Sequence, residues 1–404
     1  MARGTAGTQL DSQAQKEPLE FSAWVEVDLS ALERNLKEAD ARTTAAILPI
    51  LKGDAYGHGA PVVAAFLKSR GCSAFGVSTV EEALDILHWT RAHILLLTPP
   101  LPGQLPLVAQ HKMTATVTSP ETVFQLNRLA RMGRTHLSVQ IKVDTGFGRL
   151  GVAPQDFVSL AETIANASHL HLGGVFTHFP AAASDRAFTR QQLKCFLALK
   201  DTLPHAAVDP PVFWHAANSA AFLTLPDSHL DLVRLGTLLY GQAPVPPLGW
   251  ELQETWRFKA RIIQTRWLPP GHSVGYGRTY RTTRPTRIGV IPVGYAHGLE
   301  LEPAGSPLRQ LKRAAAKALF PRHPVVQETT PLPILGRIGM GLSCLDLTGS
   351  LLAVGDVVTV HMRRTVVGRQ IPRFYYVQGE LRCIFWNNQL FSPQGKRISL
   401  KGLF

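Results

Sequence analysis

A single lysine, Lys52, stands where an apolar run of the sequence gives way to a glycine-rich segment. The run is AAILPIL at residues 45–51, and the segment that follows, KGDAYGHG, also holds Asp54, Tyr56 and His58. One interpretation is an ordinary strand end, where a lysine marks the return to water. The other is an amine held partly out of water, which near cations loses its proton and can form a Schiff base with an aldehyde. The rest of the chain must decide between them.

Polar and cationic residues also follow other short apolar runs along the chain. These residues are Lys142, Arg149, His178, Asn218, Ser219, Arg234, Gly236 and Thr237. In a parallel barrel the carboxyl ends of the strands meet at one rim, so we expect these residues to lie close together. Each also has an ordinary explanation, because a strand-end lysine or histidine is usually structural and Asn218 or Ser219 could simply cap a helix. Their joint occurrence favours a site.

The residues at this rim suit a ligand that carries both a phosphate and an aldehyde. Ser219 at a helix start, with the backbone of Gly236 and Thr237, offers N–H groups and a hydroxyl to a phosphate dianion. A lysine near cations suits the aldehyde, and pyridoxal 5′-phosphate (PLP) combines the two groups. From the residues alone we expect a phosphate-bearing carbonyl ligand, with PLP as one candidate.

The elements that must position these residues follow from the sequence pattern. Between residues 31 and 240, amphipathic stretches alternate with eight short apolar runs, which predicts βα units and favours a closed (β/α)8 TIM-type barrel. An open doubly wound sheet would give much of the same pattern. The later runs are β-rich and separated by Pro, Gly and Asp. We therefore expect an α/β fold with a disordered tail at residues 1–20, a barrel at 21–250 and a mainly-β domain at 251–404, in which residues 302–328 form an insertion with a short basic helix.

Composition narrows the class of protein. The 404 residues are 45% hydrophobic and 18% charged, as in globular proteins with a large core. We find no apolar run of bilayer length and no signal-peptide core. The four cysteines, Cys72, Cys195, Cys344 and Cys383, lie far apart, so we expect a cytoplasmic protein without a disulfide framework or a metal site. The net charge of +13 could indicate nucleic-acid binding, but the basic residues lack interleaved aromatics, and a solvated basic surface is the expectation.

Longer motifs sharpen the prediction. In chain order, and within residues 22–348, they are ILKGDAYGHGA, IKVDTGFGRLGV, GVFTHF, HAANSA, DLVRLGTLLYGQAP, SVGYGRTY, VGYAHG and GRIGM. This ordered set resembles the alanine racemases, the fold-type III PLP enzymes. The resemblance implies a homodimer that interconverts L- and D-alanine, in which the C-terminal domain contributes to the partner's active site. It also implies the family's usual role, the supply of D-alanine for peptidoglycan.

The resemblance implies two catalytic bases. Lys52 would bind PLP covalently and serve the D-side of the substrate, and Tyr276 of the partner subunit would serve the L-side. Racemisation removes a proton from one face of a planar carbon and returns one to the other face, so two opposed bases are needed.

The family's other roles concern the cofactor and the substrate. Tyr56, Ser219, Gly236 and Thr237 would hold the phosphate, with Asn218 in the same loop. Arg234 would face the pyridine nitrogen without protonating it, supported by His178. Arg149 would reach the cofactor's phenolic oxygen and the substrate carboxylate, and Lys142 matches a lysine that is often carbamylated. Met340 would line the substrate pocket and Tyr295 the access channel.

The sequence departs from the family at the predicted entrance. Gly341 follows Met340 where an aspartate is usual, and His297 replaces an aspartate in VGYAHG. We find no counterpart of the family's C-terminal Val-Pro-Arg stretch and its tyrosine. We therefore hypothesise a channel that admits side chains larger than methyl. Asp54 and His58 receive no role.

Other functions stay open. A broader-specificity racemase of the same fold is one, and a non-catalytic PLP-binding barrel is another, although the latter would lack the second domain. A PLP decarboxylase or aldolase is disfavoured by Arg234 at the pyridine nitrogen. A nucleic-acid-associated protein rests on net charge alone.

Overall fold

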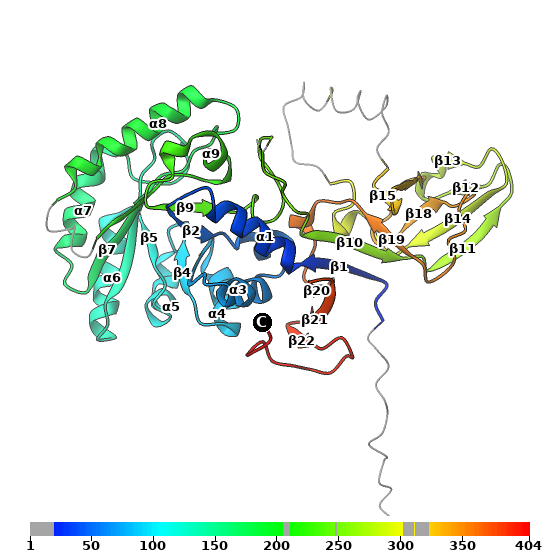
Figure 1. Cartoon of the computed structure of the whole chain (residues 1–404), viewed down its shortest axis with the longest axis horizontal. Helices are drawn as coiled ribbons and strands as arrows, with labels where there is room; N and C mark the ends of the chain where they lie inside the picture. Colours follow the sequence, from blue (N-terminus) through cyan, green and yellow to red (C-terminus); the bar gives the residue numbers. More distant parts are fainter. Residues whose placement is uncertain (1–19, 205–210, 247–248, 302–310, 312–322) are drawn as a thin grey trace, which may run out of the picture.

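The computed structural model describes residues 20–204, 211–246, 249–301, 311 and 323–404. These residues form a barrel surrounded by helices and, beside it, a β-rich lobe (Figure 1). The predicted tail, apart from Glu20, lies outside the described residues, as does nearly all of the predicted basic helix within 302–328. Among the described residues, no helix has both the length and the apolar character needed to cross a bilayer.

Eight parallel strands close into a barrel. They are β2 (Ala46–Pro49), β3 (Ala74–Val77), β4 (His93–Leu96), β5 (Ala115–Val117), β6 (Leu137–Lys142), β7 (Leu170–Phe176), β8 (Phe213–His215) and β9 (Leu232–Leu235). Parallel ladders join β2 to β9, β3 to β4, and β5 through β8 in sequence. Single parallel bridges, Ile50–Gly76, Leu95–Thr114 and Asn218–Arg234, join these groups. Every strand therefore has two neighbours, which confirms the (β/α)8 barrel and excludes the open sheet.

Helices cover the outside of the barrel (Figure 1). They are α1 (Leu29–Asp40), α3 (Ala60–Ser69), α4 (Val80–Trp89), α5 (Leu105–Gln110), α6 (Pro120–Met132), α7 (Phe157–Ala165), α8 (Arg186–Ala198) and the short α9 (Ser219–Thr224). Their starts carry local signals: Asp28, Ser119 and Asp185 each accept a hydrogen bond from a backbone N–H of the first turn. Their apolar faces are buried against the strands, as the amphipathic pattern of the sequence predicts.

The second lobe contains two larger sheets. One has the order β16-β15-β19-β10-β1-β20-β21-β22 and the other β11-β14-β18-β17. The strands are β1 (Ala23–Asp28), β10 (Trp256–Arg261), β11 (Gln264–Leu268), β14 (Thr286–Ile291), β15 (Val325–Gln327), β16 (Thr330–Leu332), β17 (Ile334–Leu335), β18 (Ser343–Asp346), β19 (Val357–Val360), β20 (Arg373–Val377), β21 (Glu380–Trp386) and β22 (Gln389–Phe391). A separate hairpin joins β12 (Ser273–Val274) to β13 (Tyr280–Arg281). This lobe is mainly β, as predicted.

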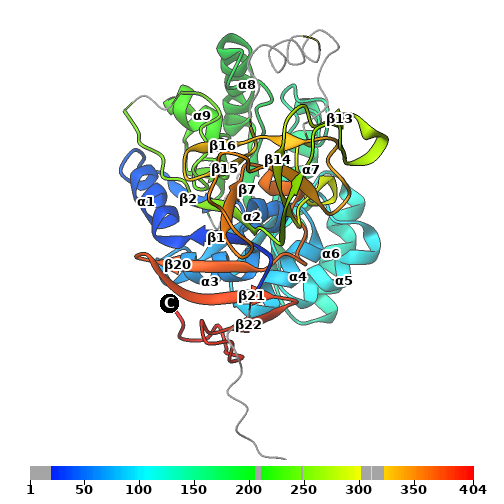
Figure 2. The ribbon, with the colours of Figure 1, turned by 90° about the vertical axis from the view of Figure 1, so that its right-hand side faces the viewer.

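Strand β1 corrects one detail of the predicted boundaries. It pairs antiparallel with β10 and parallel with β20, and Figure 2 shows β20 and β21 following it in the same sheet. The segment 21–250, predicted as barrel, therefore supplies a strand to the other lobe. The sequence gives no sign of this, because a short alternating strand does not specify partners that lie far along the chain.

Candidate functional site

A cavity of about 260 Å³ lies at the carboxyl ends of the barrel strands. Ten residues predicted for the site line it: Lys52, Tyr56, Lys142, Arg149, His178, Asn218, Ser219, Arg234, Gly236 and Thr237. Four of these side chains are lysine or arginine, and none of the described residues that line the cavity is an aspartate or a glutamate. Such a cavity favours a ligand with more than one negative charge.

Lys52 is held at the rim by the barrel itself. The N–H of Leu51 donates to Gly76 O at 2.8 Å and the N–H of Ile50 to Leu235 O at 2.8 Å, while the Tyr240 hydroxyl donates to Ile50 O. Among the described residues, the Lys52 amine has no hydrogen-bond or ion-pair partner. Burial lowers its pKa, and the nearby Arg149 lowers it further. A partly buried, unpaired amine with a lowered pKa is a candidate nucleophile and base rather than an ordinary strand end.

The turn after Lys52 is left-handed. Gly53, Asp54, Ala55 and Tyr56 have φ values of 62°, 54°, 53° and 55°, a conformation that costs non-glycine residues about 1–2 kcal/mol each. Contacts to other elements hold it, since the Gly53 N–H donates to a Glu82 carboxylate oxygen at 2.6 Å. The turn brings Tyr56 back to the cavity that Lys52 lines.

Asp54 fastens this turn to the second lobe. Its carboxylate lies 3.2 Å from Arg369 and 3.4 Å from Arg373, and it accepts the Ala60 N–H at 2.9 Å. Arg373 is 1% exposed, so the pair with Asp54 neutralises a buried charge. Burial raises the pKa of Asp54, and the two arginines oppose that shift. No role was predicted for Asp54, and these contacts make it a positioning residue.

His58 is a second positioning residue. It is fully buried, with Nε2 2.8 Å from Thr255 Oγ1 and Nδ1 2.9 Å from the carbonyl of Ala55. A carbonyl only accepts, so Nδ1 carries the proton. The ring also packs 4.6 Å from that of Tyr240. Burial lowers the pKa of His58 well below its ordinary value, so the imidazole is neutral.

Arg234 crosses the barrel interior and is fixed by three acceptors. Its guanidinium donates to Thr177 O at 2.7 Å, to Ala216 O at 2.9 Å and to Nδ1 of His215 at 2.9 Å. Because an arginine only donates, Nδ1 of His215 is unprotonated and Nε2–H must donate to Gln140 Oε1, 2.9 Å away. Burial lowers the pKa of Arg234 to about 9, so it remains cationic at neutral pH.

His178 and Lys142 lie around this guanidinium. His178 Nδ1 is 3.4 Å from Arg234 Nη2, and burial followed by the charge of Arg234 lowers the pKa of His178 to about 2. Lys142 donates to Leu97 O at 3.1 Å and lies over the Phe176 ring. Burial, and then Arg234, lower the pKa of Lys142 to about 8. The site therefore holds neutral histidines and a lysine that deprotonates readily.

The opposite side of the cavity is built from backbone and hydroxyl groups. The N–H of Gly236 donates to Ser219 Oγ at 3.1 Å, and a Cβ on Gly236 would overlap the Tyr56 hydroxyl. Burial raises the pKa of Tyr56 to about 12, so its phenol keeps its proton and can donate. The Asn218 side chain caps α9 by accepting from Ala220 N and Ala221 N. It also donates to the carbonyl of Phe179, so its polar atoms serve the fold.

Arg149 reaches the cavity from a loop organised by Asp144. The Asp144 carboxylate accepts the N–H groups of Gly146, Phe147, Gly148 and Arg149 at 2.7–3.1 Å. Burial raises the pKa of Asp144, but the four N–H donors outweigh it and the net shift is downward. The Arg149 guanidinium lies over the Phe147 ring at 4.1 Å.

The three remaining predicted residues lie elsewhere. Tyr276, Tyr295 and Met340 are in the second lobe, with exposed fractions of 74%, 51% and 65%, and none of them lines the cavity. They form one exposed cluster around Gly339: its carbonyl accepts the Tyr295 N–H at 3.1 Å, and a Cβ there would lie 3.7 Å from the Tyr276 ring. The barrel cavity and this cluster are separate parts of the subunit's surface.

Sequence reasoning overlooked several residues. Gln140, within β6, and Tyr240, in a turn after β9, support the cavity, and only their spatial contacts reveal them. The C-terminal stretch that we did not find has a close counterpart at residues 371–373, Ile-Pro-Arg in place of Val-Pro-Arg. Its arginine is the buried partner of Asp54.

Comparisons with known proteins agree with this geometry. Residues 27–244 match the family described as alanine racemase, N-terminal domain, and residues 255–371 match alanine racemase, C-terminal domain. The alanine racemase of Desulfosudis oleivorans is 36% identical over 358 residues, which are 84% of this chain and 87% of that protein.

Solved structures give the same result. An alanine racemase from Clostridium difficile superposes with a TM-score of 0.80 at 26% identity, covering 91% of this chain and 98% of the other. One from Bartonella henselae, described with covalently bound pyridoxal phosphate, has the same fold, with a TM-score of 0.72 at 24% identity over 88% of this chain and 100% of the other. With both domains matched over most of its length, the chain belongs to the alanine racemase family of amino-acid isomerases.

Proposed function

We propose that this protein is an alanine racemase that uses PLP and two bases, Lys52 of one subunit and Tyr276 of the partner subunit. The proposal rests on where the two candidate bases lie, which is in different lobes of the subunit. The barrel cavity holds an amine that has no partner among the described residues and lies near other cations, while the candidate for the second base is exposed on another lobe. A second subunit could bring the exposed cluster to the cavity.

The residues that line the cavity fit PLP. Among the described residues, they offer an amine for the aldehyde, three further cations that suit an anionic cofactor, and no opposing carboxylate. Lys52 would bind the aldehyde carbon, and Tyr56, Ser219 and the backbone near Gly236 would hold the phosphate. Bound PLP would withdraw electrons from the substrate's Cα and so acidify its hydrogen. Arg234, which retains its protons, would donate to the ring nitrogen without protonating it.

The two bases would act from opposite faces of Cα. In one direction, the Tyr276 oxygen of the partner subunit removes the proton of L-alanine and the Lys52 ammonium returns a proton to the other face. The reverse reaction exchanges the two roles. The direction of the Lys52 pKa shift supports this assignment, because burial and Arg149 lower the pKa and so make the amine easier to deprotonate than an ordinary lysine.

Lys142 is proposed to carry a carbamate. An unprotonated lysine amine attacks CO2, forming an N–C bond and releasing a proton, and the product is an anion. With a pKa of about 8, Lys142 has a larger unprotonated fraction at neutral pH than an ordinary lysine. The anion would lie among Arg149 and Arg234 and help to orient Arg149.

Isotope exchange tests the reaction. Wild-type protein with PLP is incubated with L-alanine or D-alanine in D2O, and deuterium at Cα is measured together with the enantiomer ratio. We expect racemisation with deuterium incorporation by the wild type, and its near-loss in Tyr276→Phe and in Lys52→Ala. A wild type that binds PLP but racemises no amino acid would refute the proposal.

Substrate range is the second question. A Cβ added at Gly341, next to Met340, would meet nothing within 4 Å, so the region is open within the subunit. This supports a broader-specificity racemase as the alternative function. L-Serine, L-lysine and L-arginine are assayed beside L-alanine, and strict selectivity for alanine would contradict it. Supply of D-alanine for peptidoglycan in the cytoplasm is the proposed physiological role.

A further inference from the structure

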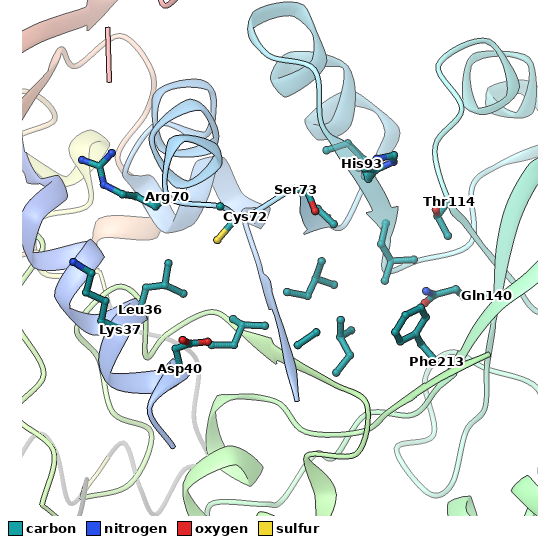
Figure 3. A pocket seen from close by; sticks show the side chains of 18 of the residues that line it. Leu36, Lys37, Asp40, Arg70, Cys72, Ser73, His93, Thr114, Gln140 and Phe213 are labelled. Atoms are coloured by element: carbon teal, nitrogen blue, oxygen red, sulfur yellow. The ribbon is translucent and has the colours of Figure 1, made fainter. Parts of the chain in front are cut away.

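A larger cavity, of about 700 Å³, lies at the amino-terminal end of the barrel, opposite the candidate site. Its wall includes the first residues of five strands, Ala46 of β2, Ala74 of β3, His93 of β4, Phe213 of β8 and Leu232 of β9. Figure 3 shows its labelled side chains around an open space, with Lys37 and Arg70 on one side and Gln140 and Phe213 on the other. This volume is in the range of small-molecule sites.

Strand β7 places Gly174 beside Gln140, its partner in the β6–β7 ladder. A Cβ on Gly174 would lie 2.9 Å from Gln140 Nε2, so the glycine leaves room for the Gln140 amide. The remaining wall is largely apolar and includes Leu36, Ile47, Leu48, Ile94, Leu95 and Leu232. Apolar walls of this kind favour an apolar ligand over water.

Gln140 is one of the polar groups that line the cavity, together with Ser73, His93 and Thr114. The Gln140 Oε1 accepts the His215 Nε2–H, and this orientation of the amide is fixed by the arginine beyond it. The amide Nε2 therefore faces the cavity, and among the described residues it has no hydrogen-bond partner. Gln140 is half-buried although it lies inside a closed barrel, because the cavity exposes it. It offers a ligand an N–H donor.

The mouth of the cavity carries no net charge. Lys37 and Arg70 both pair with the Glu33 carboxylate, at 2.7 Å and 2.9 Å, and Asp40 supplies a second negative charge at the rim. Two cations and two anions balance, so the mouth attracts neither anions nor cations as a class. A neutral molecule suits this entrance best.

We propose that this cavity is a binding site for a neutral, mainly apolar small molecule that accepts a hydrogen bond from the Gln140 amide. The site is distinct from the candidate active site, and its residues have no part in the proposed reaction. It nevertheless touches the same network, because Gln140 bonds to His215 and His215 bonds to Arg234. A ligand that fixes the Gln140 amide therefore fixes the support of Arg234, so occupancy of the two sites is coupled.

Calorimetric titration with two isosteric probes tests the site. Acetophenone has an apolar ring and a carbonyl acceptor, and α-methylstyrene has a methylene group in place of the oxygen. We expect acetophenone to bind about fivefold more tightly, which is the value of one hydrogen bond. In Gln140→Met the two affinities should become equal. Absence of binding by both probes, or a preference that persists in Gln140→Met, overturns the proposal.

Two further measurements do not depend on whether Gln140→Met folds stably. Ala74→Phe fills the cavity from β3 without changing Gln140, and should abolish binding of both probes.

Cys72 lines the cavity, whereas Cys195, also half-buried, lies on α8 away from it. Acetophenone should slow the alkylation of Cys72 by N-ethylmaleimide and leave that of Cys195 unchanged. Equal rates with and without the probe at Cys72 would place its binding elsewhere and contradict the proposal.

Coupling to the active site is measured on the same protein. The Kd of acetophenone is determined without PLP and with saturating PLP, whose own binding is followed by absorbance. The coupling predicts different values in the wild type and equal values in Gln140→Met. Equal values in the wild type would overturn the coupling. Because no amino-acid substrate is present, failure of the proposed racemase reaction would not produce either result.

Discussion

Replacing Lys142 by methionine should stabilise the folded protein at neutral pH. Lys142 is 6% exposed, and burial together with Arg234 lowers its pKa from 10.5 to about 8. A shift of this size corresponds to about 3 kcal/mol of destabilisation at pH 7, where the amine is charged in both states. Methionine removes this penalty but loses the hydrogen bond to Leu97 O, worth about 1 kcal/mol. We expect a net gain of about 2 kcal/mol.

The same reasoning fixes the pH dependence. Between pH 8 and 10.5 the unfolded chain binds a proton at Lys142 that the folded chain does not, so wild-type stability rises with pH through this group. Above that window the amine is neutral in both states and the advantage of Lys142→Met disappears. Urea unfolding at pH 7 and pH 11, in CO2-free buffer without PLP, gives both values.

A matched control is the exposed Lys194 on α8. Lys194→Met should change the free energy of unfolding by less than about 0.5 kcal/mol at either pH. A Lys142→Met variant that is less stable than wild type at pH 7, or that differs equally at both pH values, would refute the reasoning. Bicarbonate should stabilise the wild type and Lys194→Met but not Lys142→Met, because carbamylation of Lys142 replaces the buried ammonium with an anion beside Arg234.

Three other substitutions test separate contacts. Gly236→Ala should weaken PLP binding at least about tenfold in an absorbance titration, because the added Cβ displaces the Tyr56 hydroxyl; unchanged affinity would contradict the close approach. Asn218→Ala should lower the free energy of unfolding by about 1 kcal/mol through loss of the α9 cap, whereas a loss of PLP affinity at unchanged stability would show a ligand contact instead. Asp54→Ala should destabilise by about 3 kcal/mol in urea unfolding, because it leaves Arg373 buried without its carboxylate. A neutral effect would show that the hydrogen bonds from Arg373 to the carbonyls of Gly368, Ile371 and Val367 suffice.

The barrel could be predicted from the sequence because each strand carries its own local signal. All eight apolar runs became barrel strands, and the polar residues after them line one cavity, since parallel strands end at a common rim. Residues 23–28 fall in the segment predicted as barrel but form β1 in the second lobe, because the partners β10 and β20 are specified by tertiary contacts rather than by a local pattern. Closure itself depends on single bridges between short strands, which no local pattern reveals.

The residues that line the site could be predicted from the sequence. The contacts that hold those residues in place could not. The left-handed turn at residues 53–56 contradicts the local preference of three non-glycine residues, and only contacts such as Asp54–Arg373 explain it. The bonds from Arg234 to His215 and from His215 to Gln140 join three strands, so sequence spacing does not indicate them. The roles of Tyr276, Tyr295 and Met340 remain predictions that rest on a second subunit.

Mixing two inactive variants tests the shared active site most directly. Lys52→Ala and Tyr276→Phe proteins are each assayed alone, then unfolded together, refolded with PLP and assayed for alanine racemisation. If each site takes Lys52 from one subunit and Tyr276 from the other, the mixture recovers about a quarter of wild-type activity. This value follows because half of the dimers are mixed and each mixed dimer holds one intact site. A mixture no more active than the two variants alone, with mixed dimers demonstrated by mass spectrometry, would contradict the account.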